Sequence, residues 1–393
     1  MTTRAGIGLS QQQDAWLAGM EAASQAAWST AGPADLVIVF MTDHYQPEAV
    51  RQGICSVMGK SPVIGCCVPS LFTTHGFSAE GVAVMALAGE DLKVRLALAE
   101  GIRANPQAVG RRVIESLNKD LAVAYRANKQ VAILALADAL SGFMAEVVEG
   151  ATDVLGPACL MVGGTACDNF KFLKSFQFID DQIHSDALVA ALLSTSSPIG
   201  VGVSHGYKPV DRPLVATRTD HNIVYEFDGQ PAFEAYQRAW ANEVPEVNSE
   251  GFATFAKAHP LGLPQLRGEY VIRDLVRVHP DGAIECFSTV PENAVVHMMS
   301  VDQESLYKAT RGAALQALAS LGGQPPAAVL VFNCISRVAL LKGDMTVEID
   351  HVRDVVGDET PLIGFFSFGE IATPPRGGLA AFYNKTVVVC ALA

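Results

Sequence analysis

The fold is decided by three C-terminal segments: PPAAVLVF (residues 325–332), PLIGFFSFGEIATPP (residues 361–375) and GLAAFYNKTVVVCALA (residues 378–393). Their pattern indicates a strand, a helix, a second strand, a glycine-bearing turn and a third strand. Similar segments occur twice earlier in the chain. They are PADLVIVF (33–40), PVIGCCVPSLFTTHG (62–76) and GVAVMALA (81–88), then QVAILAL (130–136), PACLMVGGTACDN (157–169) and SDALVAALLS (185–194). In every copy the first two strands start about thirty residues apart, which predicts one structural unit used three times.

The predicted fold class is α/β, with repeated strand-helix-strand-strand modules that form mixed sheets flanked by helices. Continuous apolar strands indicate burial on both faces. A β-rich insert is expected from Ile199 to Met299, with turns at Asp228-Gly229 and Asp281-Gly282 and one helix from Pro231 to Trp240. Residues 175–182 and 186–194 are expected to form a hairpin. We expect two domains: residues 1–198 with two module copies, and residues 199–393 with the β-rich segment and the third copy.

The composition excludes several classes of protein. The chain has 393 residues, of which 50% are hydrophobic, and a net charge of −13, which argues against non-specific binding to nucleic acid or to an anionic membrane. No apolar run is long enough to span a bilayer, and the N-terminus lacks the apolar core of a signal peptide. We therefore expect a cytoplasmic protein. Its eight cysteines include no Cys-x-x-Cys pair, so we expect reduced, buried thiols, and Cys66-Cys67 fits a strand end better than a redox or metal pair.

The chain resembles the FIST sensory domains of bacterial signalling proteins. VIGCC and GVAVMAL resemble the N-terminal part; YEFDGQPAFEAY, HPLGL, FNCISR, IGFFSFGEIA and YNKTVVV resemble the C-terminal part. The resemblance implies a small-ligand sensor that signals to a separate partner. One branch of stand-alone FIST proteins binds haem b, senses nitric oxide and regulates a histidine kinase in two-component signalling. This chain has Tyr383 where the family motif usually carries histidine before Asn384.

Polar residues follow the predicted strands of the last copy. We expect them to form a ligand-binding site at the strand ends of an α/β sheet. The residues are Cys334, Arg337, Gly364, Gly369, Glu370 and Asn384. Arg337 offers a planar fork of donors for a carboxylate and Glu370 an acceptor for an ammonium, which together suit an amino-acid-like ligand. The alternative is that Arg337 and Glu370 pair with each other and hold two loops together.

A haem would need an imidazole with an apolar wall around it. His221, at a probable turn, and His205, at the end of an apolar strand, are the first candidates for the iron ligand, with His44 and His75 as alternatives. Nearby aromatic residues would wall a porphyrin, although the same residues are typical of an ordinary sheet core. No covalent haem attachment motif occurs.

Catalytic motifs are absent from the sequence, including a Gly-x-Ser-x-Gly elbow, a Walker loop and a His-Glu-x-x-His pair. We therefore expect no enzyme. Three hypotheses follow: a haem-binding nitric-oxide sensor that regulates a partner histidine kinase, a binding module for an amino acid or another small metabolite, and an interaction scaffold. The sequence leaves open whether the protein forms a homodimer.

Overall fold

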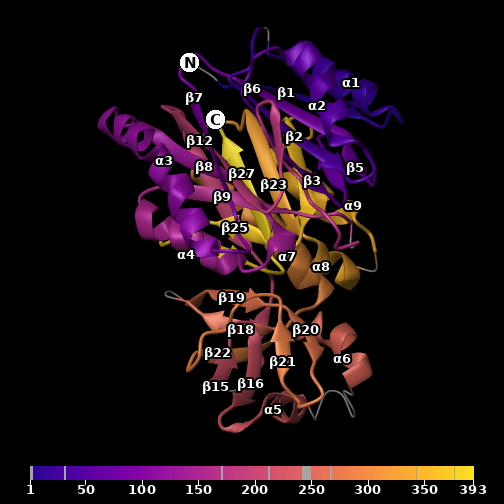
Figure 1. The fold of residues 1–393 in the computed structure, drawn as a ribbon, viewed down its shortest axis with the longest axis vertical. Coiled ribbons are helices and arrows are strands. Elements are labelled where there is room, and N and C mark those ends of the chain that lie inside the picture. Colours follow the sequence, from indigo (N-terminus) through magenta and orange to yellow (C-terminus); the bar gives the residue numbers. More distant parts are fainter. Residues whose placement is uncertain are drawn as a thin grey trace.

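The computed structural model describes residues 3–30, 32–169, 171–210, 213–240, 249–265, 268–341, 343–375 and 377–393. The chain forms two parts (Figure 1). We call the larger part the three-sheet body (residues 3–204 and 303–393) and the smaller part, which is built from residues 208–300, the β-domain. The chain crosses between them twice, at residues 205–207 and 301–302.

The three-sheet body contains three six-stranded sheets. In spatial order, the first sheet is β1 (Arg4–Ser10), β6 (Val82–Ala88), β2 (Leu36–Thr42), β3 (Val63–Val68), β10 (Gln177–Ile179) and β11 (Gln182–His184). The second is β7 (Lys93–Glu100), β12 (Ala187–Thr195), β8 (Gln130–Asp138), β9 (Leu160–Ala166), β25 (Glu370–Ala372) and β26 (Ala381–Tyr383). The third is β13 (Ile199–Ser204), β27 (Val387–Leu392), β23 (Ala328–Cys334), β24 (Leu362–Ser367), β4 (Leu71–Thr73) and β5 (Gly76–Ser78).

The predicted repeat is confirmed, because each sheet uses the same strand order. Within each copy, the two strands that a helical segment connects are parallel, as in β2–β3, β8–β9 and β23–β24. The last long strand of the copy lies antiparallel to the first, as in β6 with β2, β12 with β8, and β27 with β23. The same glycine in each copy lies opposite a residue of the parallel neighbour: Gly65 opposite Val39, Gly163 opposite Ala135, and Gly364 opposite Val331. A Cβ there would lie only 1.8–2.2 Å from that neighbour's carbonyl oxygen, so the close strand contact requires glycine.

The short hairpin of each copy pairs with another copy's sheet. The hairpin β4–β5 of the first copy extends the third sheet, β25–β26 of the third copy extends the second, and β10–β11 of the second copy extends the first. The expected hairpin of residues 175–182 with 186–194 is therefore wrong. A turn with Asp180 at φ 49° folds β10 back onto β11 instead, and β12 pairs with β7 and β8.

Helices cover the outer faces of the sheets (Figure 1). They are α1 (Ala15–Trp28), α2 (Pro47–Met58), α3 (Pro106–Arg126), α4 (Met144–Leu155), α7 (Gln303–Ala319), α8 (Ile335–Val338) and α9 (Thr346–Val356), with 3-10 turns at Ala139–Ser141 and Ala339–Leu341. The inner faces meet in one apolar core at the centre of the body. There Phe365 packs edge-on against Phe40 and Phe332, with ring centroids 4.7 and 5.4 Å away.

The β-domain is a nine-stranded sheet with two helices. Its strands are β19 (Tyr270–Arg273), β18 (Leu261–Pro264), β22 (Val295–Ser300), β15 (Leu214–Asp220), β16 (Ile223–Phe227), β21 (Ile284–Cys286) and β20 (Leu275–Val278), with β14 (Lys208–Pro209) on β22 and β17 (Gln230–Pro231) on β16. Its helices are α5 (Ala232–Ala239) and α6 (Ser249–Ala256); the sequence predicted the first and missed the second. The expected insert began too early, because β13 pairs with β27 in the body.

Candidate ligand-binding site

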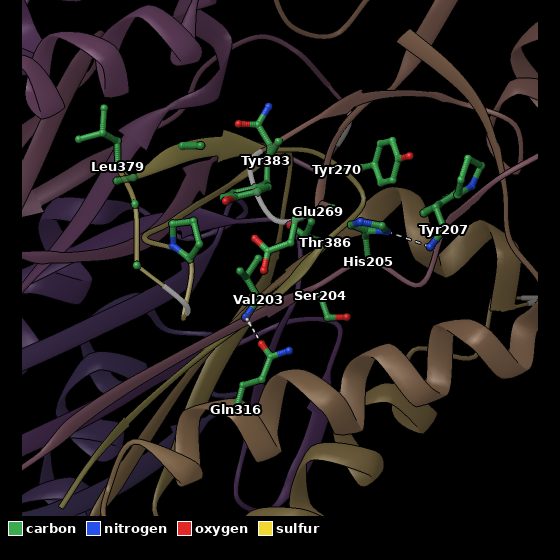
Figure 2. Close-up of a pocket in the computed structure, with 18 residues that line it drawn as sticks. Val203, Ser204, His205, Tyr207, Glu269, Tyr270, Gln316, Leu379, Tyr383 and Thr386 are labelled. Carbon is green, nitrogen blue, oxygen red and sulfur yellow. Dashed lines mark hydrogen bonds between the residues drawn. The ribbon is translucent and has the colours of Figure 1, made fainter. Parts of the chain in front are cut away.

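A cleft of about 870 Å³ lies where the chain crosses from the three-sheet body into the β-domain. We call it the interdomain cleft. Residues of both parts line it, and Figure 2 shows them. The lining residues are Val203, Ser204, His205, Tyr207, Pro209, Gln265, Gly268, Glu269, Tyr270, Gln316, Pro374, Gly377, Gly378, Leu379, Ala380, Ala381, Tyr383 and Thr386.

Three segments position the polar groups of the cleft. The end of β13 and the crossing segment bring His205 and Tyr207, the turn between β18 and β19 brings Glu269, and the turn between β26 and β27 brings Tyr383 and Thr386. The crossing segment is held close to α7, because a Cβ at Gly206 would lie 2.6 Å from the carbonyl oxygen of Ser305. The backbone of Gly206 has a φ of 83°, which favours glycine.

His205 is held in one tautomer by the backbone. The amide of Tyr207 donates a 2.9 Å hydrogen bond to His205 Nδ1 (Figure 2). A neutral imidazole that accepts at Nδ1 carries its hydrogen on Nε2. Burial, and then the charge of Arg337, lower the pKa of His205 to about 4, so the ring is neutral at physiological pH.

Gln316 contributes a second donor group. Its Oε1 accepts a 3.1 Å hydrogen bond from the backbone amide of Val203. The side-chain amide of Gln316 is thereby fixed, and its NH₂ group is left for the cleft (Figure 2).

Glu269 supplies the formal charge of the cleft. Among the lining residues that the structure describes, it is the one with a charged side chain, since His205 is neutral. Its carboxylate forms no ion pair with a basic side chain of the described residues. Burial, and then the nearby Glu269 charge, raise the pKa of Tyr383, whose side chain is 6% exposed.

Arg337 lies behind the cleft in a closed polar cluster. Its side chain is fully buried and forms an ion pair with Glu348 of α9. Nη1 donates to the carbonyl oxygens of His205 and Lys385, and Nη2 donates to Leu306 O as well as to Glu348. Nε also donates to Glu348, so every donor of Arg337 is used. No donor is left for a ligand carboxylate.

The Arg337–Glu348 pair is charged and fully hydrogen-bonded. Burial alone would raise the pKa of Glu348, but the charge and hydrogen bonds of Arg337 hold it below its usual value. Thr310 and Asn333 also donate to the Glu348 carboxylate, at 2.7 and 2.8 Å. The expected alternative, a pair between Arg337 and Glu370, is therefore wrong: the partner is Glu348, which the sequence analysis did not single out.

Glu370 occupies a separate buried position, in β25. Its two oxygens accept hydrogen bonds from Ser367 Oγ at 2.5 Å and Thr386 Oγ1 at 2.6 Å. Burial raises the pKa of Glu370 to about 8, more than these donors lower it. Glu370 therefore does not line the cleft itself but contacts Thr386, which does.

The other predicted site residues are packed within the body. A Cβ at Gly364 would meet the ring of Phe72, and a Cβ at Gly369 would meet the ring of Phe382, at 2.2 and 2.1 Å. Cys334 is buried, with its pKa raised to about 12 chiefly by burial. Asn384 is 1% exposed, and its Oδ1 has no hydrogen-bond partner within the part of the chain that the structure describes.

Lys385 links the two parts of the molecule and was missed in the sequence analysis. Its side chain is fully buried, and Nζ lies 2.9 Å from Oδ1 of Asp274 in the β-domain. Its φ of 59° is left-handed, as the tight turn into β27 requires. A lysine in a strand-flanking turn is usually solvated, so its type and position carried no signal of burial.

The remaining histidine candidates lie outside the cleft. His44 and His75 are exposed in loops of the first copy. His221 lies in an exposed turn of the β-domain, with its side chain 65% exposed and Nδ1 2.8 Å from Asp220. The structure thus brings His205 alone among the four candidates into the lining of the cleft.

The cysteines are free thiols, and all except Cys55 are buried. Cys67 Sγ donates to the carbonyl oxygen of Cys167 at 3.3 Å. Burial, and then the neighbouring Cys67, raise the pKa of Cys66. The described residues contain no group of three or more His, Cys, Asp or Glu that could hold a metal ion.

Two family models match the chain in sequence. The FIST N domain matches residues 35–230, and the FIST C domain matches residues 232–373. The chain belongs to the FIST family. FIST domains are small-ligand-sensing domains of signalling proteins. The two models divide the chain at β17, inside the β-domain, whereas the division expected at residue 198 precedes β13. No helix among the described residues is long and apolar enough to cross a membrane.

Three relatives with similar sequences are named as uncharacterized proteins. One from Methanocaldococcus jannaschii is 23% identical over 69% of this chain and 55% of its own length. One from Mycobacterium tuberculosis is 28% identical over 58% of this chain and 60% of its own length. One from Mycobacterium bovis is 24% identical over 98% of this chain and 97% of its own length. The match therefore spans little more than half of the first two relatives. A crystal structure of cyanuric acid hydrolase from A. caulinodans is similar with a TM-score of 0.37 and 10% identity, over 100% of this chain and 99% of that one.

Proposed function

We propose that this FIST protein senses a small polar ligand in the interdomain cleft and reports it by a change in how the β-domain sits on the three-sheet body. The observation that carries the proposal is the cleft itself: the body and the β-domain each contribute part of its wall. A ligand that touches both walls would favour one relative position of the two parts over others.

The turn between β26 and β27 connects the cleft to the contact between the two parts. Tyr383 and Thr386 of this turn line the cleft, and Lys385 between them pairs with Asp274 of the β-domain. Next to it, Arg273 of the β-domain donates from Nη1 to the carbonyl oxygen of Phe382. A ligand that displaces the turn therefore acts on the ion pair and on this hydrogen bond together.

Transmission to a partner is a further part of the proposal. The family's sensory role supports an effector that reads the position of the β-domain, and a histidine kinase is the partner that the family resemblance suggests. Such a partner would bind one of the two positions more tightly than the other, which is the condition for a signal.

Haem binding and nitric-oxide sensing also rest on the family resemblance. Iron ligation by His205 Nε2 would require the ring hydrogen to move to Nδ1, where it would face the amide N–H of Tyr207. His205 therefore does not fit haem in the observed arrangement. His221 has Nδ1 beside Asp220 and the ring of Phe143 5.8 Å away, but its side chain is 65% exposed, whereas a haem ligand requires an apolar surrounding.

An absorption titration with haem, followed by nitric oxide, tests that idea. A sharp Soret band that is lost in His205→Ala or His221→Ala would support haem as the ligand. A spectrum of loosely associated haem that neither variant changes would reject it.

The proposed sensor function is tested by a thermal-shift screen with small ammonium, neutral and anionic metabolites. A ligand that binds the native state raises the melting temperature. Ser204→Trp, which places a large side chain at the cleft wall, should abolish that shift without lowering the melting temperature of the free protein by more than a few degrees. If no compound shifts the wild-type protein, the chain is better described as an interaction scaffold.

A further inference from the structure

Among the described residues that line the interdomain cleft, Glu269 is the one with a charged side chain. Glu269 is half-buried on the β18–β19 turn, and no basic side chain among the described lining residues faces it. By contrast, the buried carboxylate of Glu348 nearby is paired with Arg337. A half-buried carboxylate is stabilised when a cation takes the place of the water that it loses, so Glu269 favours a positively charged ligand.

Three tyrosines line the same cleft as Glu269. Tyr270 adjoins Glu269 in sequence, Tyr383 lies on the opposite wall, and Tyr207 lines the same cleft (Figure 2). The hydroxyl of Tyr207 donates to Lys257 O at 2.8 Å, which fixes its ring. Tyrosine rings beside a carboxylate are the usual surroundings of an ammonium group, because the ring faces carry negative charge and tolerate methyl groups.

Two other polar side chains of the cleft, His205 and Gln316, present donors. His205 accepts at Nδ1 and so presents Nε2–H, and Gln316 accepts at Oε1 and so presents its NH₂ group. Both lie on the body side, and Glu269 lies on the β-domain side. A ligand that satisfies both sides carries a cation at one end and an oxygen acceptor at the other.

We infer that the interdomain cleft binds an organic cation, a primary or methylated ammonium compound that also carries a hydroxyl or carbonyl oxygen. Its ammonium group lies against Glu269 and the tyrosine rings, and its oxygen accepts from His205 or Gln316. The inference rests on the proposed sensor function and specifies the class of ligand. The inferred ligand carries a hydroxyl or carbonyl oxygen where an amino acid would carry its carboxylate, because Arg337 has no free donor for a carboxylate.

Matched pairs of probes test the charge directly. Choline and 3,3-dimethylbutan-1-ol have nearly the same shape but differ by one positive charge, and ethanolamine and propan-1-ol form a second pair. Spermidine extends the cationic set, and succinate is the anionic probe. Calorimetric titration of the full chain should show at least tenfold tighter binding of an ammonium compound than of its neutral partner, and this preference should decrease with added salt.

Two variants assign the preference to the cleft. Glu269→Gln keeps the shape of the side chain and removes its charge, so it should weaken ammonium binding at least tenfold and leave the neutral probe unchanged. Glu292→Gln removes an exposed charge elsewhere in the β-domain and should leave both affinities as they are.

The outcomes separate this inference from the proposed function. If neutral compounds or succinate bind as tightly as the cations, and Ser204→Trp abolishes that binding, the sensor function stands and the inference of a cation is overturned. If ammonium binding is unchanged in Glu269→Gln, the inference is likewise overturned. If no probe of any charge binds, both proposals fail.

Discussion

Two polar regions lie next to each other where the third copy of the repeat meets the β-domain, and they differ in one respect. In the closed cluster around Arg337, the charges and most hydrogen-bonding groups have partners within the protein. In the interdomain cleft, Glu269 has no basic partner among the described residues and His205 presents a donor. The closed cluster therefore serves the fold, while the cleft leaves polar groups for a ligand.

Thr386 connects the wall of the cleft to Glu370, which is buried apart from the Arg337–Glu348 pair. Its side chain and backbone amide donate to Glu370, and the residue also lines the cleft. Hydrogen bonds to the body thus hold this part of the cleft wall in place. Substitutions in the closed cluster should consequently lower the stability of the protein, whereas substitutions in the cleft should change ligand binding.

Glu348→Ala should have the largest effect. It leaves the Arg337 guanidinium buried without a carboxylate, and such a loss typically costs about 3–5 kcal/mol of the free energy of unfolding. Urea unfolding of the purified protein measures it. Asp354→Ala is the matched control on the same helix, because its pair with Arg311 is exposed and should contribute less than about 1 kcal/mol. Equal losses of stability in the two variants would show that the buried Arg337–Glu348 pair contributes no more than the exposed Arg311–Asp354 pair.

The sequence predicted the units of the fold well and their assembly poorly. The strands of each copy are continuous apolar runs, and helices such as α2 carry their own signals, here a proline in the first turn. The exchange of hairpins between copies could not be predicted. A three-residue strand such as β4 has the same local sequence whichever sheet it joins, so only the packing of the whole body selects its partner.

The candidate site shows the same limit. Polar residues after the strands of the last copy were found, but the sequence could not tell a closed cluster from an open cleft. Glu348 closes the cluster from α9, where its position resembles that of an ordinary solvated helix residue. His205 was correctly expected at an apolar strand end. Glu269 was missed, because it lies in a turn between two short strands with no motif around it.

The free energy of unfolding should depend on pH because of the titration of Glu370. Its folded pKa of about 8 lies above its ordinary value of 4.5, so the folded state binds a proton that the unfolded state has lost. Its contribution to stability is thus complete below about pH 4.5 and is lost as the pH rises through about 8. The loss should reach roughly 2.5 kcal/mol between about pH 5 and pH 7.

Glu370→Gln should remove most of this slope, because glutamine keeps the two hydrogen-bonding positions without titrating. Urea unfolding of wild type and variant at about pH 5, 6 and 7 provides the comparison. A wild-type slope that persists in Glu370→Gln would show that another group carries it.

Asp274→Asn should have an intermediate effect at the boundary between the two regions. It leaves the buried ammonium of Lys385 without its carboxylate, but Asp274 is itself 22% exposed, so we expect a loss of roughly 2 kcal/mol. Hydrogen exchange should increase at β26 and β20, on both sides of the lost pair. Asp220→Asn, in an exposed turn of the same domain, is the control. Adding Lys385→Met to Asp274→Asn should restore part of the lost stability, and a further loss would mean that the two residues act independently.

Glu269→Gln should have the smallest effect on stability, although it removes the charge on which the proposed cation depends. The carboxylate has no basic partner among the described residues, so its loss breaks no ion pair, and the free energy of unfolding should change by less than about 0.5 kcal/mol. Urea unfolding without ligand measures this change in the free energy of unfolding. Urea unfolding with saturating choline measures how much the ligand stabilises each protein. Choline should stabilise the wild type and not the variant, because mass action stabilises only a protein that binds. A loss of stability in the ligand-free variant as large as that of Asp274→Asn would place Glu269 with the closed cluster, as a group that the fold itself requires.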